Sequence, residues 1–224
     1  MKRIVVLVSG RGSNLRSIVA AGLPLQIAAV ISNRPGAAAL AFAAEHGIVT
    51  HVIDHSAYPG REAFDANLQT AIDAHQPDLV VLAGFMRLLT PGFVQHYAGR
   101  MLNIHPALLP AFPGLDTHAR ALQAGCRLHG CTVHLVTADV DAGPIVAQAS
   151  VPVLPDDTTE TLAARVLAEE HRLYPAVLRA WLHGDWWLQG DRVQWRDGRH
   201  WPPPAHYPAS DPTADTAPPG QPLV

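Results

Sequence analysis

Residues 4–14 read IVVLVSGRGSN, an apolar segment that runs directly into a glycine-containing turn and then into helical periodicity. Five consecutive aliphatic residues are typical of a strand buried on both faces of a parallel sheet. Gly10 and Gly12 allow the backbone to turn tightly, and Leu15, Ile18 and Val19 place apolar side chains along the helix that follows. The stretch therefore predicts a strand–turn–helix unit at the N-terminus.

The same alternation continues along the first hundred residues. Short segments rich in β-branched residues predict strands at 4–8, 27–32, 51–53, 79–82 and 101–104. Helical periodicity predicts helices at 14–21, 37–46, 61–75 and, after Thr90-Pro91, up to about residue 97. Strands that alternate with helices indicate a parallel sheet with helices on both faces.

The pattern changes in the C-terminal half. Prolines and a glycine make 108–115 a loop, and helices are expected at 117–124 and 158–182. Segments 132–136 and 145–153 predict an antiparallel strand pair, and 186–189 with 192–195 a terminal hairpin. We therefore predict a single α/β domain with a Rossmann-like, mostly parallel central sheet and antiparallel additions in its C-terminal half.

Length and composition set the limits of this domain. The chain has 224 residues, 48% of them hydrophobic and 16% charged, with a net charge of −3. We assign 1–201 to the domain and 202–224, with its many prolines, to a disordered tail. No apolar stretch can span a bilayer and no basic field favours nucleic acid, so neither partner is expected. The short apolar N-terminus and two cysteines favour a cytoplasmic location.

The turn after the first strand is suited to an anion. The free N–H groups at the start of the helix would point outward, and Ser13 and Asn14 would add side-chain donors. A dinucleotide fingerprint needs a small residue where Leu15 stands, so a single phosphate fits better. The alternative is that the glycines only make a tight connection.

The segment 103–106, Asn-Ile-His-Pro, ends the strand at 101–104. Residues two apart in a strand share a face, so Asn103 and His105 would emerge together at the carboxyl end of the sheet, where ligands of such sheets bind. An amide and an imidazole could stabilise an oxyanion, and His105 could also move a proton. Alternatively, the two side chains only satisfy each other.

Two further sets of residues are candidates for a role in the site. Asp139 or Asp141, in a turn-rich connection, could orient His105 as its carboxylate partner, or both could be solvated loop residues. Cysteines and histidines at 126, 129, 131 and 134 suggest zinc, but there is no Cys-x-x-Cys pair, and positions 131 and 134 of a strand face opposite sides. We expect no metal.

Four motifs in this order resemble the phosphoribosylglycinamide formyltransferases: SGRGSNL at 9–15, LAGFMR at 82–87, NIHPALLP at 103–110 and DAGP at 141–144. The likeness covers roughly residues 1–200. It implies a one-carbon transferase of purine biosynthesis, which passes the formyl group of 10-formyltetrahydrofolate to the amino group of glycinamide ribonucleotide. It implies no metal, and it leaves both a monomer and a homodimer open.

The resemblance also implies roles for individual residues. His105 would be the general acid, Asn103 would contact the formyl group, and Asp141 would keep His105 protonated. The ribonucleotide would be held by Gly12, Ser13, Asn14 and Glu170, although Glu170 could also be a solvent-facing helix carboxylate. The folate would be held by Arg61, Met86, Arg87, Leu88, Leu89 and Asn103. His134 would lie near the active site.

Two positions depart from the family pattern. Ala107 stands where Ser is usual, and Ala142 replaces a common Gly, which could stiffen the loop that carries Asp141. The alternative functions are a formyltetrahydrofolate hydrolase and a non-catalytic folate- or nucleotide-binding module. A methionyl-tRNA formyltransferase would need an additional RNA-binding domain, and neither the length nor the net charge of this chain is suited to one.

Overall fold

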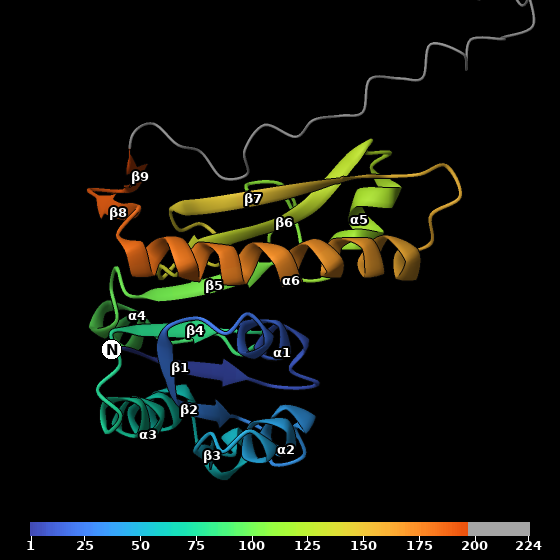
Figure 1. The fold of residues 1–224 in the computed structure, drawn as a ribbon. Helices are drawn as coiled ribbons and strands as arrows, with labels where there is room; N and C mark the ends of the chain where they lie inside the picture. The colour runs from blue at the N-terminus through green and yellow to red at the C-terminus, as the bar shows by residue number, and fades with distance from the viewer. Residues whose placement is uncertain (197–224) are drawn as a thin grey trace, which may run out of the picture.

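The structure, a computed structural model, describes residues 1–196 (Figure 1). The predicted tail at 202–224 and the end of the predicted domain therefore lie outside the described residues. The main sheet contains β1 (Lys2–Val8), β2 (Leu25–Ser32), β3 (Thr50–Val52), β4 (Leu79–Leu82), β5 (Met101–His105), β6 (Leu128–Leu135) and β7 (Ile145–Pro152). The helices are α1 (Ser13–Ala20), α2 (Ala38–Glu45), α3 (Arg61–Asp73), α4 (Pro91–His96), α5 (Thr117–Gln123) and α6 (Thr159–His183), with a short 3-10 turn at His55–Ala57.

The sheet has the order β3-β2-β1-β4-β5-β6-β7. The pairs from β3 to β5 are parallel, and β6 and β7 are added antiparallel. A separate hairpin, β8 (Trp186–Gln189) with β9 (Arg192–Trp195), follows α6. The predicted fold class is confirmed. The chain order reverses between β1 and β4, and in such sheets ligands bind at the carboxyl ends of the strands around that point.

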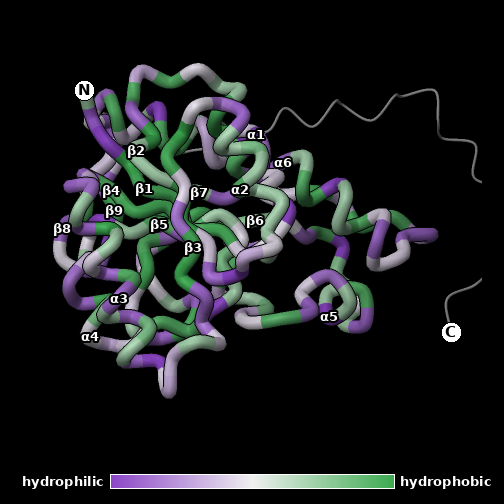
Figure 2. Tube along the Cα trace, turned by 90° about the horizontal axis from the view of Figure 1, so that it is seen from below, coloured by the Kyte–Doolittle hydropathy of each residue, from purple (hydrophilic) through white to green (hydrophobic). Residues whose placement is uncertain are grey.

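The sheet separates two apolar cores. Helices α1, α2 and α6 cover one face, where they pack on the even-numbered residues of β1 and on Leu102 and Ile104 of β5. Helices α3 and α4 cover the other face, where they pack on Val5 and Leu7 of β1 and on Met101 of β5. Figure 2 shows the hydrophobic strands running through the middle of the molecule. This parity places Asn103 and His105 on the face opposite Leu102 and Ile104, as predicted.

The prediction for β6 was too short, because the strand begins at Leu128 and not at Thr132. The prediction stops short of residue 128 because Gly130 lies in between, and a glycine, which has no side chain to pack, weakens the prediction of a strand. Here the missing side chain is required: a Cβ on Gly130 would lie 2.0 Å from the Ala149 carbonyl oxygen of β7. The glycine therefore allows close approach of the two strands instead of ending β6.

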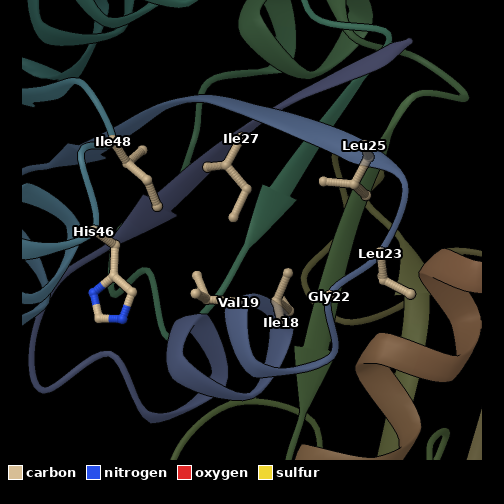
Figure 3. Close-up of a pocket in the computed structure, with 8 residues that line it drawn as sticks. All are labelled: Ile18, Val19, Gly22, Leu23, Leu25, Ile27, His46 and Ile48. Carbon is tan, nitrogen blue, oxygen red and sulfur yellow. The ribbon is translucent and has the colours of Figure 1, made fainter.

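An apolar groove lies at the amino-terminal end of β2, between α1 and the turn after α2 (Figure 3). Ile18, Leu25, Ile27 and Ile48 line it, with His46 at one side. This is the sheet edge opposite the carboxyl ends of the strands, so the groove is separate from the site described below. Among residues 1–196, no helix is long and apolar enough to cross a membrane.

Candidate active site

The last residues of β5 form the centre of the site. His105 is buried, with 5% of its surface exposed, and Asn103 is half-buried on the same face. The His105 ring lies between two oxygen atoms: its Nε2 donates to the Phe112 carbonyl at 2.9 Å, and its Nδ1 is 3.3 Å from Asp141 Oδ2. Because both oxygens can only accept, the imidazolium is the form of His105 that satisfies both.

Asp141 is held in place by the backbone around it. It adopts a left-handed conformation, with φ of 52°, in the connection between β6 and β7. Its Oδ2 also accepts the Gly114 N–H at 2.8 Å. Burial alone would raise the pKa of Asp141, but the hydrogen bond from the Gly114 N–H and the charge of His105 help to outweigh burial and lower it. Asp141 is therefore a bound, ionised partner of His105 rather than a solvated loop residue, whereas Asp139 is exposed.

His134, on β6, orients the Asn103 amide. Asn103 Nδ2 donates to His134 Nε2 at 3.1 Å, and His134 Nδ1 donates to the Leu135 carbonyl at 3.0 Å. The same Nε2 lies 3.6 Å from Asp141 Oδ1. One amide hydrogen and the carbonyl oxygen of Asn103 remain available, so the amide can still bind a ligand oxygen.

The turn after β1 has the geometry of an anion site. Gly12 has φ of +74°, and a Cβ there would lie 2.6 Å from Ala39 Cβ, so the turn packs directly on α2. Helix α1 begins at Ser13, which leaves the first N–H groups without intrahelical acceptors. Arg11 and Arg34, which sequence reasoning did not single out, line a hollow beside the turn. Both are exposed, and in the described part of the chain neither forms an ion pair.

Glu170, on α6, lies beside this turn. It is 7% exposed, so the alternative of a solvent-facing carboxylate is wrong. Asn14 Nδ2 donates to Glu170 Oε2 at 2.7 Å, while Asn14 Oδ1 is buried without a partner among the described residues. Burial raises the pKa of Glu170, and the hydrogen bond from Asn14 opposes that shift.

Four of the predicted folate residues, Met86 to Leu89, lie between β4 and α4. Met86 and Leu88 are each 58% exposed, which is unusual for large apolar side chains next to a core. Arg87 lies between them in sequence, with its guanidinium 5.5 Å from the centre of the Phe64 ring. Leu89 packs against the core beneath α3 and α4. Arg61 begins α3 and is exposed, and within 1–196 no ion pair joins it to this segment.

The remaining cysteines and histidines form a different arrangement. Cys126 and Cys131 are free thiols, and Cys131 is buried in the core under α6. His129 Nε2 is 3.1 Å from His118 Nδ1, and burial together with the charge of His118 lowers the pKa of His129 to about 4. Across residues 1–196 no group of three side chains is placed to hold a metal ion.

The two departures from the motif fit their surroundings. Ala107 is fully buried, and its carbonyl accepts from Thr132 Oγ1 at 2.6 Å. Ala142 is exposed and does not adopt positive φ, so an alanine there needs no strained backbone. The tight position is Gly143, where a Cβ would lie 1.8 Å from the Leu135 carbonyl oxygen.

Comparisons with known proteins agree on one family. A family profile described as formyl transferase matches residues 2–178. Phosphoribosylglycinamide formyltransferase of Escherichia coli is 47% identical over 204 residues, which cover 89% of this chain and 96% of that protein. The chain belongs to the phosphoribosylglycinamide formyltransferase family. The resemblance found in the sequence motifs is thereby confirmed.

Solved structures of the family have the same fold. Phosphoribosylglycinamide formyltransferase from Coxiella burnetii is 50% identical with a TM-score of 0.84, over 87% of this chain and 93% of that chain. A formyltetrahydrofolate deformylase from Pseudomonas syringae pv. tomato is 30% identical with a TM-score of 0.80, but this chain covers only 65% of it. The transferases are thus matched over nearly their whole length and the deformylase over part of it.

Proposed function

We propose that this chain transfers the formyl group of 10-formyltetrahydrofolate to the amino group of glycinamide ribonucleotide. The observation that carries the proposal is the convergence of Asn103, His105 and Asp141 at the carboxyl end of β5 in a member of this family. The phosphate would bind the Gly12–Asn14 turn, where Arg11 and Arg34 add positive charge that the chain as a whole lacks.

The reaction would proceed through a tetrahedral intermediate. The neutral amine attacks the formyl carbon, a C–N bond forms, and negative charge develops on the formyl oxygen. The Asn103 amide and the His105 imidazolium would stabilise that charge. The bond to folate N10 then breaks, N10 takes up a proton, and the amine nitrogen loses one. Proton transfer through His105 would serve this exchange.

Asp141 would act on His105 rather than on the substrate. Its carboxylate favours the imidazolium and holds the ring through Nδ1, so Nε2 is the nitrogen that would face the formyl oxygen. In the described structure Nε2 donates to the Phe112 carbonyl, which the substrate would have to replace. Met86, Arg87, Leu88 and Leu89 would line the folate side, with Arg61 at its rim. Glu170 and Asn14 would face the ribonucleotide.

A spectrophotometric assay with 10-formyl-5,8-dideazafolate tests this proposal. We expect formyl release that requires glycinamide ribonucleotide, with at least a hundredfold loss of turnover in folded His105→Ala and Asn103→Ala variants. Release without the amine would favour the hydrolase, and binding without turnover would favour the non-catalytic module. Near-normal turnover of folded His105→Ala would refute the assigned role.

A further inference from the structure

The segment Met86–Leu89 is held from both ends by buried side chains that carry no role so far. At one end the Met86 N–H donates to Ser9 Oγ at 2.7 Å. At the other end the Thr90 N–H donates to Asp65 Oδ2 at 2.6 Å. Ser9 is 5% exposed and Asp65 is 3% exposed. The N–H groups of Met86 and Thr90 have no backbone acceptor in a strand or a helix. The side chains of Ser9 and Asp65 supply the missing acceptors.

The acceptor at each end is itself fixed. Ser9 Oγ donates to Asn33 Oδ1, which is buried at the end of β2, and the Ser9 N–H donates to the Gly84 carbonyl at 3.1 Å. Asp65 lies in α3 beside Phe64 and Leu68, both about 1% exposed. Ser9 directly follows β1 and Asp65 lies in α3, so the segment is anchored between the end of β1 and α3.

The segment between these ends has free binding capacity. In the described part of the chain, no hydrogen bond engages the backbone N–H or C=O of Arg87, Leu88 or Leu89. The side chains of Met86 and Leu88 face outward. A backbone that is held only at its ends, with exposed apolar side chains between, presents a preorganised strip for a flat heterocycle.

We propose that Ser9 and Asp65 are positioning residues for the folate co-substrate, which act by fixing the two ends of Met86–Leu89. This inference rests on the proposed function. Ser9 also directly precedes the Gly10–Asn14 turn, so one residue joins the strip for the formyl donor to the turn for the acceptor's phosphate.

Steady-state kinetics of Ser9→Ala and Asp65→Ala test this role. We expect the KM for 10-formyl-5,8-dideazafolate to rise by about tenfold in both variants, the factor for one lost hydrogen bond of this kind, with kcat at saturating folate within about twofold. For Asp65→Ala, which lies away from the phosphate turn, the KM for glycinamide ribonucleotide should also stay within about twofold. Asp65→Asn, which keeps an oxygen that can accept the Thr90 N–H, should restore most of the affinity for the folate.

Two matched controls separate positioning from stability. Asp73 ties α3 to the far end of α4 through His96 and Tyr97, so Asp73→Asn disturbs the same helix pair without touching Met86–Leu89. Ser32→Ala removes a buried hydroxyl at the end of the neighbouring strand, where it bonds both the N–H and the carbonyl of Arg34, so it is a control for stability and for the folate KM alone. Thermal melts of all variants would show how much stability each loses.

The outcomes are distinct. A wild-type protein without amine-dependent formyl transfer would overturn the proposed function. Active wild type, with Ser9→Ala showing an unchanged KM for the folate, would overturn this inference alone. The inference would also fail if Asp65→Ala changed kcat and both KM values in the same proportion as Asp73→Asn. If Asp65→Ala does not fold, the KM values of Ser9→Ala and Asp65→Asn for the folate still test the inference.

Discussion

Replacement of Asp141 by Asn removes the negative charge beside His105 while keeping nearly the same shape. The two groups are 3.3 Å apart, and their side chains are only 12% and 6% exposed. At an effective dielectric constant of about 20, a full charge pair at this distance is worth at most about 5 kcal/mol. Asn still offers an oxygen to the Nδ1 hydrogen, so we expect a loss nearer the ~1.5 to 3 kcal/mol of a charge-assisted hydrogen bond.

That loss corresponds to about a 10- to 150-fold decrease in kcat/KM near neutral pH. The assay is formyl transfer from 10-formyl-5,8-dideazafolate to glycinamide ribonucleotide, followed by absorbance. Asp139→Asn is the matched control, because Asp139 is exposed in the same connection and should leave the rate unchanged. If folded Asp141→Asn transferred formyl groups at the wild-type rate, the coupling of Asp141 to His105 would have no part in catalysis.

Three predictions concern stability. Gly130→Ala places a Cβ 2.0 Å from the Ala149 carbonyl oxygen, so we expect a cost of about 3 kcal/mol and a Tm lower by about 6 to 12 °C; an unchanged melt would contradict the close approach of β6 and β7. Because folding lowers the pKa of Asp141, its carboxylate stabilises the native state above the ordinary Asp pKa. The excess unfolding free energy of wild type over Asp141→Asn should therefore shrink as pH falls from about 5 toward about 3. Burial raises the pKa of Glu170, so native protein binds the extra proton, and the stability of wild type relative to Glu170→Gln should increase as pH falls from about 8 to about 4; denaturant titrations that show a constant difference would refute it.

Much of the fold follows from local patterns. The run of aliphatic residues at 4–8 with its glycine turn predicts the first βα unit, and strand parity predicts that Asn103 and His105 share a face. Both predictions depend only on residues that are close together in the sequence. The start of β6 does not, because the need for Gly130 arises from β7, a strand that approaches from elsewhere in the sequence.

The site shows the same division. The motifs at 103–106 and 141–144 locate the residues around His105. No sequence pattern indicates that His105 Nε2 donates a hydrogen bond to the Phe112 carbonyl. The contact between Asn14 and Glu170 joins residues 156 positions apart. In the sequence, Asp65 cannot be distinguished from other polar residues of an amphipathic helix. Only the packing of α3 brings its carboxylate to the Thr90 N–H. Tertiary packing decides these roles.

A crystal structure with glycinamide ribonucleotide and a folate analogue that cannot transfer its formyl group is the most direct measurement. The account predicts that the acceptor amine and the formyl carbon meet between the Asn103 amide and the His105 ring, with the phosphate on the N–H groups of the Gly12–Asn14 turn. An amine bound away from Asn103 and His105, or a phosphate bound elsewhere, would contradict it.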